Sequence, residues 1–178
     1  MTSLQTYSGE MATTLKGVAP ASNPALAEIE KSTGPSNFLR TMAHRPEAMQ
    51  DFFQLYSRLM GPGARLDKRI REMVYLAVSD VNECDYCATH HRKGALAAGF
   101  SEKELGEINT ENNQHFNPKE QAALHYAREL TRTASVSDDL RYRVQELFSA
   151  DEFVELTMIV GLANFTNRFN NGLAVPVE

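Results

Sequence analysis

The sequence predicts an all-α protein that folds as a single compact multi-helix domain. From about residue 22 onward, apolar residues recur at intervals of three and four, which is typical of helices with one buried face. No convincing stretch of alternating apolar and polar residues indicates a β-strand. A chain of 178 residues has the size of one domain and can bury a sufficient core without disulfides. We therefore expect a helical domain over residues 22–178, with roughly eight helices, after a flexible tail over residues 1–21.

Three helices are expected in the first half of this domain. The first covers residues 45–60 and ends at Gly61-Pro62-Gly63, which cannot continue a helix. The second begins after the N-cap Asp67 and ends near residue 82, and the third covers residues 84–98 and stops at Gly99. The apolar stripe of the first helix is expected in the core, with part of it lining an apolar pocket: Met49, Phe52, Phe53, Tyr56, Leu59 and Met60.

Capping motifs predict the starts of the remaining helices. Ser101-x-x-Glu104 and Ser149-x-x-Glu152 have the pattern of a capping box. Asn117-Pro118-x-Glu120 combines a cap, a first-turn proline and an N3 glutamate, and another helical segment begins at Ser137. A polar cluster follows the apolar part of the last helix. We expect it either to cap the end of that helix or to form a subunit contact or pocket rim: Asn164, Asn167, Arg168, Asn170 and Asn171.

Composition and charge exclude several classes of partner. The chain has 18 basic and 23 acidic residues and no polybasic run, so we expect no nucleic-acid partner. No apolar stretch approaches the ~20 residues that span a bilayer, so we expect no membrane association. Residues 1–20 lack the basic and apolar regions of an export signal, which predicts a cytoplasmic protein. In a reducing compartment, the two cysteines are expected to be catalytic or metal-binding rather than structural.

The two cysteines form the motif Cys84-Asp85-Tyr86-Cys87 at the predicted start of a helix. Backbone N–H groups and the helix dipole favour a thiolate at this position and lower the pKa of a thiol. The spacing suits a reversible disulfide between the two sulfurs. Residues i, i+3 and i+7 share one face of a helix, so His91 is expected on the same face as both cysteines. His90 lies three residues from Cys87 but off this face, so His91 is the better candidate base.

Glu72 is the fourth member of the candidate site. It lies beside Met73 on the buried face of the preceding helix, where a carboxylate is costly to bury unless it is paired or handles a proton. If the two helices pack antiparallel, Glu72 can approach the thiols. Two thiols, an imidazole and a carboxylate could take a proton from one sulfur, protonate a leaving oxygen and close a disulfide. The set predicts peroxide reduction through a sulfenic acid and then an internal disulfide, which a thiol reductant reopens.

The spacing of these residues resembles the alkylhydroperoxidase D branch of the carboxymuconolactone decarboxylase family. The resemblance rests on Glu72 twelve residues before Cys84, on the Cys-x-x-Cys pair, and on His91 four residues after Cys87. It covers the chain from about Leu55 to Gly99, and the helical remainder is compatible with the same fold. The decarboxylase branch generally lacks the cysteine pair, which counts against lactone chemistry.

The resemblance implies a role for each residue of the site. Cys87 would react with the hydroperoxide, Cys84 would resolve the product, and Glu72 with His91 would relay protons. The best-known members have a histidine immediately before the second cysteine, where this chain has Tyr86. The Tyr86 hydroxyl is expected either to pack or to orient a bound hydroperoxide. The resemblance also implies homo-oligomers, either trimers or hexamers, and an enzyme that needs no metal, haem or flavin.

The predicted activity is that of an alkylhydroperoxide reductase-like thiol peroxidase, which reduces organic hydroperoxides or hydrogen peroxide. Two alternatives stay open. A general thiol-disulfide oxidoreductase or redox sensor would use the same cysteines on a protein partner. A zinc-stabilised binding module would use Cys84, Cys87 and His91 as ligands, with Glu72 or His90 as the fourth. Rates with peroxide and with protein disulfides separate the first two functions, and metal analysis exposes the third.

Overall fold

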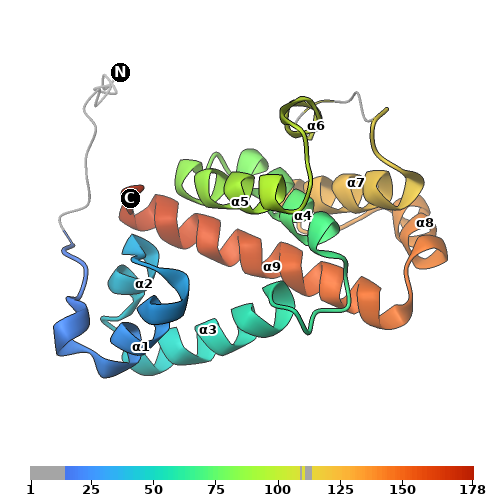
Figure 1. The fold of residues 1–178 in the computed structure, drawn as a ribbon. Coiled ribbons are helices and arrows are strands. Elements are labelled where there is room, and N and C mark those ends of the chain that lie inside the picture. The colour runs from blue at the N-terminus through green and yellow to red at the C-terminus, as the bar shows by residue number, and fades with distance from the viewer. Residues whose placement is uncertain (1–14, 109, 111–113) are drawn as a thin grey trace, which may run out of the picture.

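The computed structural model describes residues 15–108, 110 and 114–178, and it confirms an all-helical single domain (Figure 1). Over these residues the chain forms nine α-helices and one short 3-10 helix, with no β-strand. In chain order the elements are η1 (Pro20–Ser22), α1 (Pro24–Thr33), α2 (Asn37–Met42), α3 (Pro46–Met60), α4 (Lys68–Val81), α5 (Asp85–Ala97), α6 (Glu102–Glu107), α7 (Pro118–Thr133), α8 (Asp138–Leu147) and α9 (Ala150–Leu173).

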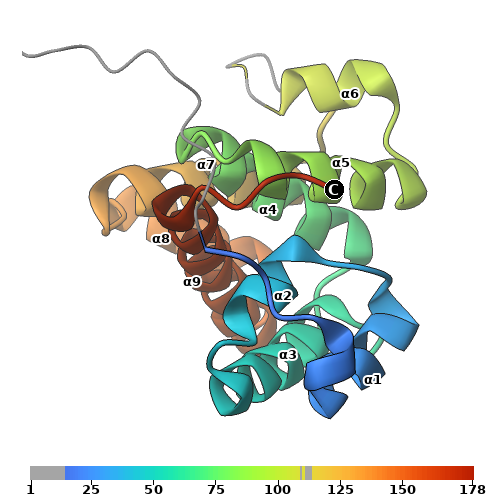
Figure 2. The same cartoon turned by 90° about the vertical axis from the view of Figure 1, so that its left-hand side faces the viewer.

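The long helix α9 runs through the middle of the molecule, and the other helices pack around it (Figures 1 and 2). Helices α4, α5 and α7 contact α9 from one side, and α3 contacts it from the other. The loop between α3 and α4 is tied to α9 by the buried Glu155. Its carboxylate accepts hydrogen bonds from the backbone N–H groups of Arg65 and Leu66, each at 2.8 Å.

The buried apolar side chains form two clusters. The larger cluster lies among α4, α7 and α9 and forms the main core. The smaller cluster joins α1, α2 and α3 to the start of α5, and it contains Leu26, Phe38 and Met49 together with Cys84 and Cys87. The two cysteines therefore lie where the N-terminal helices meet α5.

Hydrogen bonds confirm most of the predicted helix starts. The side chain of Asp67 caps α4, and that of Cys84 caps α5. Complete capping boxes begin at Ser101, Asn117 and Ser149, as their sequences predict. Helix α8 begins directly after Ser137, although that side chain makes no capping hydrogen bond. Helices α1 and α2 divide the segment before residue 45, where the pattern predicts helix but no boundaries.

The polar cluster on the last helix does not end it. Helix α9 continues through the cluster to Leu173, because the asparagine side chains bond to neighbouring helices rather than compete for the turns of their own. The Asn164 amide donates to Thr131 on α7 at 3.1 Å. The Asn167 oxygen accepts a hydrogen bond from Asn82 at the end of α4, at 2.9 Å.

Part of the predicted N-terminal tail, residues 1–14, lies outside the described residues. In the part that is described, the backbone N–H of Val18 donates to the carbonyl of Arg40 at 2.9 Å. The carbonyl of Lys16 lies 2.9 Å from Nε2 of His44. None of the described helices combines the length and apolar character that crossing a membrane requires.

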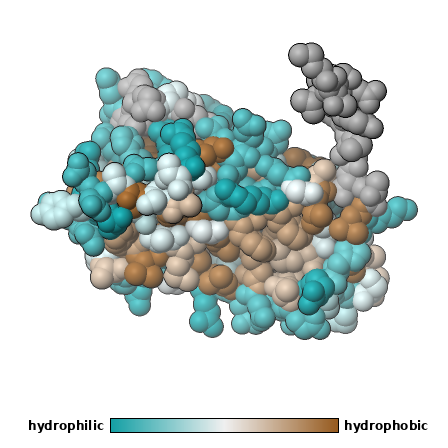
Figure 3. Space-filling view, turned by 180° about the vertical axis from the view of Figure 1, so that it is seen from behind, coloured by the Kyte–Doolittle hydropathy of each residue, from teal (hydrophilic) through white to brown (hydrophobic). Residues whose placement is uncertain are grey.

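An exposed apolar groove, which we call the α3–α9 face, runs between α3 and α9. Figure 3 shows a broad apolar area on the surface seen from behind. The side chains of Leu55, Met158 and Phe165 are 40%, 43% and 51% exposed. Contiguous apolar surface of this kind is typical of a docking site. The residues that line the groove are Phe52, Leu55, Leu59, Met158, Gly161, Leu162 and Phe165.

Candidate active site

The N-terminus of α5 brings the two cysteines together. Cys84 is the N-cap residue and Cys87 lies in the first turn. The Cys84 thiol donates a hydrogen bond to the Cys87 sulfur across 2.7 Å. The backbone N–H of Cys87 in turn donates to the Cys84 sulfur at 3.4 Å. Both residues are free cysteines and both are buried, so the pair is close enough to form a disulfide with little movement of the backbone.

The two sulfurs hold their protons with different strength. The hydrogen bond from Cys84 is the largest effect that lowers the pKa of Cys87, to about 6, and the amides of Asn170 and Asn167 and the charge of a protonated His91 add to it. Burial opposes this shift. The pKa of Cys84 is raised well above its usual range, because its thiol donates to Cys87 and because it is desolvated. At neutral pH Cys87 is therefore the thiolate and Cys84 keeps its proton.

His91 and Glu72 form a buried pair, so the carboxylate expected near the thiols bonds to the imidazole. Helices α4 and α5 pack along each other, and His91 Nδ1 lies 2.8 Å from Glu72 Oε2. Each residue is 8% exposed. The His91 ring stacks on Tyr75 with 3.6 Å between centroids, and the Tyr75 hydroxyl lies 2.6 Å from Thr166 Oγ1 on α9. The imidazole is therefore fixed at one nitrogen and on one face.

Gly94 leaves the space that the Glu72 carboxylate occupies. It lies within α5, three residues after His91. A Cβ atom at this position would fall 2.5 Å from Glu72 Oε2 and 2.6 Å from its Cδ, far inside contact distance. Its φ is outside the left-handed region, so the backbone does not require glycine here. The signal in the sequence was a glycine inside a helix, which is unfavourable unless packing demands it.

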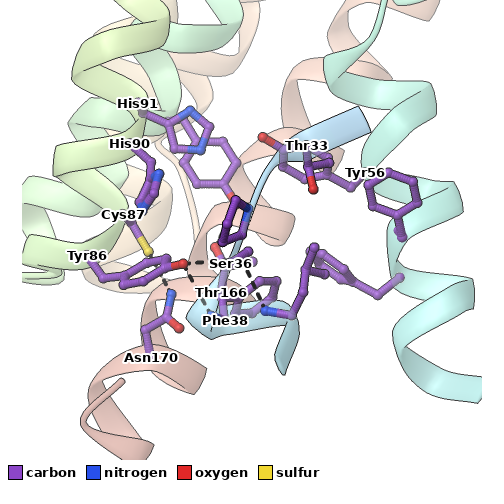
Figure 4. Close-up of a pocket in the computed structure, with 15 residues that line it drawn as sticks. Thr33, Ser36, Phe38, Tyr56, Tyr86, Cys87, His90, His91, Thr166 and Asn170 are labelled. Atoms are coloured by element: carbon purple, nitrogen blue, oxygen red, sulfur yellow. Dashed lines mark hydrogen bonds between the residues drawn. The ribbon is translucent and has the colours of Figure 1, made fainter. Parts of the chain in front are cut away.

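The Cys87 side chain faces a pocket of about 240 Å³, formed by the end of α1 and by residues of α2, α3, α4, α5 and α9 (Figure 4). His91 and Asn170 also line this pocket, whereas Cys84 does not. Most of the wall is aromatic or aliphatic, including Phe52 and Tyr56 from the stripe on α3. The full lining is Thr33, Pro35, Ser36, Phe38, Leu39, Phe52, Phe53, Tyr56, Tyr75, Tyr86, Cys87, His90, His91, Thr166 and Asn170.

Tyr86 joins α5 to the last residues of the chain. Its hydroxyl donates to the Glu178 carboxylate at 2.8 Å and accepts the backbone N–H of Phe38 at 3.2 Å. Glu178 also contacts His90 Nε2 at 2.7 Å and accepts a hydrogen bond from the backbone N–H of Asn37. The Tyr86 ring lines the pocket, but its hydroxyl proton is already donated to Glu178 rather than to a ligand. His90 thus faces Glu178, and His91 faces Glu72.

Asn170 is a residue of the site that the cysteine motif does not reveal. It lies on α9, 83 positions from Cys87, and its Nδ2 donates to the Cys87 sulfur at 3.2 Å. The sequence marks it only as a member of the polar cluster. That cluster contributes to the pocket through Asn170, while Asn167 donates to Ser79 at 3.2 Å beneath the site.

Within the described parts of the chain, no three His, Cys, Asp or Glu side chains are grouped so that they could hold a metal ion. The cysteines contact each other, and His91 bonds to Glu72. The zinc alternative therefore gains no support from the geometry.

Comparisons with known proteins agree with the expected family. A family model described as the carboxymuconolactone decarboxylase family matches residues 46–129. The chain is 31% identical over 115 residues to "Uncharacterized protein YnjA" of Escherichia coli (strain K12), covering 64% of this chain and 63% of that protein. It is 30% identical over 108 residues to "Uncharacterized protein YdfG" of Bacillus subtilis (strain 168), covering 59% of this chain and 74% of that protein. The chain thus spans slightly less than two thirds of the Escherichia coli relative.

Solved structures share the fold over almost the whole chain. An uncharacterized peroxidase-related protein from Silicibacter sp. TM1040 has a TM-score of 0.78 at 22% identity, and the match covers 94% of each chain. The debrominase Bmp8 in its apo form has a TM-score of 0.82 at 19% identity, again over 94% of each chain. At such identities the likeness concerns the fold alone. The chain belongs to the carboxymuconolactone decarboxylase family and has the all-helical fold of its alkylhydroperoxidase D-like, peroxidase-related proteins.

Proposed function

We propose that this protein is a thiol peroxidase that reduces hydroperoxides with the Cys84–Cys87 pair. One observation carries the proposal: a cysteine with its pKa lowered to about 6 faces a pocket, and a second thiol lies 2.7 Å behind it. A thiolate in contact with a pocket is the nucleophile that a hydroperoxide needs, and the second thiol can attack the resulting sulfenic acid to close a disulfide.

The reaction would take place in two steps. The Cys87 thiolate attacks the distal oxygen of R–O–O–H, the O–O bond breaks, and the alkoxide leaves with a proton as R–OH. Cys87 is then a sulfenic acid, oxidised by two electrons. Cys84 attacks the Cys87 sulfur, the S–O bond breaks, and hydroxide leaves with the Cys84 proton as water. The internal disulfide is returned to two thiols by an external dithiol or by two monothiols, which are oxidised in exchange.

We assign His91 the role of proton donor to the departing alkoxide, with Glu72 as its positioning partner. His91 lines the pocket on the same helix as Cys87, and its Nδ1 bond to Glu72 leaves Nε2 for the substrate side. Stacking on Tyr75 prevents the ring from turning away. Proton delivery by a fixed imidazole is a typical contribution of general acid catalysis.

The burial of the cysteines favours a small oxidant over a protein disulfide. Cys84 is 1% exposed and Cys87 is 4% exposed, and a protein sulfur must touch the attacking thiolate to exchange with it. A small hydroperoxide can enter the pocket without this contact. The reductant that reopens the disulfide must likewise place a thiol in the pocket.

Reductive dehalogenation of a small aromatic ring is a second candidate. The aromatic wall of the pocket favours it, and the similarly folded debrominase Bmp8 was solved in complex with 2,3,4-tribromopyrrole. The same two thiols would supply the two electrons, converting Ar–X to Ar–H and HX as they form the disulfide. Bromide release from a bromopyrrole, with no thiol loss to hydroperoxide, would favour this candidate over the peroxidase.

We also propose that copies of the chain associate through the α3–α9 face, in keeping with the oligomers that the resemblance implies. This face is apolar and partly exposed, and Phe52 belongs both to it and to the pocket. A second copy seated there would bury apolar surface beside the wall of the site.

The first prediction concerns the roles of the two cysteines. Stoichiometric cumene hydroperoxide should convert both thiols of the reduced protein to an internal disulfide. In Cys84→Ser the reaction should stop at a sulfenic acid on Cys87, which dimedone traps. Cys87→Ser is the matched control and should keep its remaining thiol. Intact mass and thiol titration measure the result. A sulfenic acid trapped on Cys84 would reverse the assigned roles, and survival of both thiols would rule out the peroxidase function.

The second prediction concerns the pH dependence of Cys87. Its alkylation rate should rise with pH through a midpoint near 6 and then level off, because only the thiolate reacts. Cys84→Ala removes the donor that contributes most to the low pKa, so its midpoint should move toward the ordinary thiol range. Cys84→Ser keeps an O–H donor and should lie between the two. Mass-resolved iodoacetamide kinetics measure all three, and an unchanged midpoint in Cys84→Ala contradicts the proposed cause.

The third prediction concerns Gly94. Gly94→Ala should displace the Glu72 carboxylate and lower the peroxidase rate by up to about 100-fold, because a misplaced proton donor is costly to the transition state. An alanine inside an open helix position would otherwise stabilise the fold. Gly106→Ala is the control, since a Cβ there meets nothing within 4 Å. Peroxidase rates should fall in Gly94→Ala and stay unchanged in Gly106→Ala, and thermal melting should show that both variants are folded. Full activity in Gly94→Ala would contradict the close approach of residue 94 to the Glu72 carboxylate.

The fourth prediction concerns association through the α3–α9 face. Sedimentation velocity should find the wild-type chain larger than a monomer, whereas Met158→Asp should weaken association at least tenfold because it buries a charge. Tyr142→Asp on α8, at a residue that is more exposed than Met158 and lies off this face, should associate like the wild type. A monomeric wild type or an unaffected Met158→Asp would argue against this interface.

A further inference from the structure

One hydroxyl group in the wall of the pocket is left without a protein partner. Six of the side chains that line the pocket carry a hydroxyl, and five of these hydroxyls form hydrogen bonds within the protein. The five are those of Thr33, Ser36, Tyr75, Tyr86 and Thr166. The sixth is that of Tyr56 on α3, which forms no hydrogen bond to any described residue. The pocket therefore offers a bound molecule one hydroxyl that the described part of the chain does not use.

The Tyr56 oxygen is also within reach of a small molecule. Two fully buried side-chain atoms lack a partner in the described parts of the chain, Arg71 Nε and Asn170 Oδ1, and the Tyr56 hydroxyl is not one of them. The Tyr56 ring is partly buried against the main core, which holds it in place. A hydroxyl in such a position bonds to water or to a ligand, because polar groups in folded proteins rarely stay unsatisfied.

The Tyr56 side chain extends from α3 toward the helices that carry the reactive groups. Figure 4 shows it on the opposite wall of the pocket from Cys87 and His91. Burial raises the pKa of Tyr56, the charges of Glu72 on α4 and of Cys87 raise it further, and Arg71 lowers it. Since such effects weaken with distance, the phenolic oxygen lies at the end of the ring that faces α4 and α5. The phenol keeps its proton at neutral pH, so it is a hydrogen-bond donor.

We infer that Tyr56 is a catalytic residue whose hydroxyl donates a hydrogen bond to the proximal oxygen of the hydroperoxide, which is the oxygen that leaves as an alkoxide. The inference rests on the proposed peroxidase function and adds a donor on the wall opposite His91. The Cys87 thiolate attacks the distal oxygen, and the electron pair of the O–O bond passes to the proximal oxygen. Tyr56 stabilises the charge that develops there and keeps its own proton. His91 supplies the proton that completes R–OH.

The contribution of Tyr56 depends on how basic the departing oxygen is. A hydrogen bond that becomes stronger as negative charge develops lowers the barrier of the reaction. The alkoxide from tert-butyl hydroperoxide is a strong base, whereas the acetate from peracetic acid is a stable anion. Loss of the hydroxyl should therefore slow the first reaction more than the second. A merely structural role of Tyr56 would instead slow every reaction of Cys87 by a similar factor.

The experiment compares Tyr56→Phe with the wild type in single-turnover reactions of Cys87. The rate constant with tert-butyl hydroperoxide should fall roughly 10- to 100-fold, and the rate constant with peracetic acid should fall less. Iodomethane, which contains no oxygen, should methylate the same thiolate at the wild-type rate, with its pH midpoint still near 6. Intact mass measures the three reactions.

Tyr126→Phe is the matched control. The Tyr126 hydroxyl is outside the pocket and lies 2.9 Å from Thr157 Oγ1. This variant loses a hydrogen bond within the protein, so its melting temperature should fall while its oxidation rate stays at the wild-type value. Tyr56→Phe loses no such bond and should melt like the wild type. Tyr56→Leu also lacks the hydroxyl and should show the same difference between hydroperoxide and iodomethane, which keeps the test decisive if Tyr56→Phe does not fold.

The outcomes distinguish this role from the proposed function. An unchanged rate with tert-butyl hydroperoxide in folded Tyr56→Phe would overturn the role and leave the peroxidase function standing. An equal loss of rate with tert-butyl hydroperoxide, peracetic acid and iodomethane would also overturn it, because the ring would then only shape the pocket. If neither peroxide oxidises the wild-type thiols while iodomethane still methylates Cys87, the peroxidase function itself fails, and the role of Tyr56 fails with it.

Discussion

The hydrogen bond from the Cys84 thiol to the Cys87 sulfur is the interaction on which the rest of the site depends. It exists because Cys84 stands just outside α5 as its N-cap and Cys87 stands in the first turn, so that both sulfurs meet at the same end of the helix. The bond makes two chemically identical side chains unequal. One sulfur is left as a thiolate with its pKa near 6, and the other holds its proton against burial. The packing of the remaining helices determines which of the two sulfurs faces the pocket.

Helix α9 and the N-terminal helices form the pocket that, of the two cysteines, only Cys87 faces. The thiolate lies against the pocket that α1, α2 and α3 form with α9, and Cys84 lies behind it in the smaller apolar cluster. Asn170 and Asn167 on α9 stabilise the thiolate through their amide groups. The pocket wall thus combines mostly apolar side chains with the fixed amide group of Asn170, and this is the usual composition of a small-molecule site.

The local part of this arrangement could be predicted from the sequence, and the long-range part could not. Caps at Asp67 and Ser149 follow from short-range hydrogen bonding, and the place of His91 on the face of the cysteines follows from helical spacing. The spacing brings Glu72 toward the thiols, and its pairing with His91 is implied only by the family resemblance. The contact of Asn170 with Cys87 joins residues 83 positions apart, and no periodicity encodes which face of α9 meets α5. The continuation of α9 through its asparagines was likewise decided by partners on other helices. Gly94 lies between these cases, since its place in a helix is visible in the sequence but its reason is the Glu72 carboxylate.

The same hydrogen bond sets the order of the two steps in the proposed reaction. Cys84 must become a thiolate to attack a sulfenic acid, yet its pKa is raised chiefly by its hydrogen bond to the Cys87 sulfur. That constraint holds only while Cys87 carries a negative charge. Once the Cys87 sulfur has taken an oxygen it is neutral, so the bond that retained the Cys84 proton weakens and the pKa of Cys84 falls. In the proposed reaction the resolving thiol would therefore be held inactive until the nucleophile has reacted, and it would then be activated next to its target. Attack within one helical turn has the high effective concentration of an intramolecular reaction, so this order would favour closure of the sulfenic acid to a disulfide over its further oxidation.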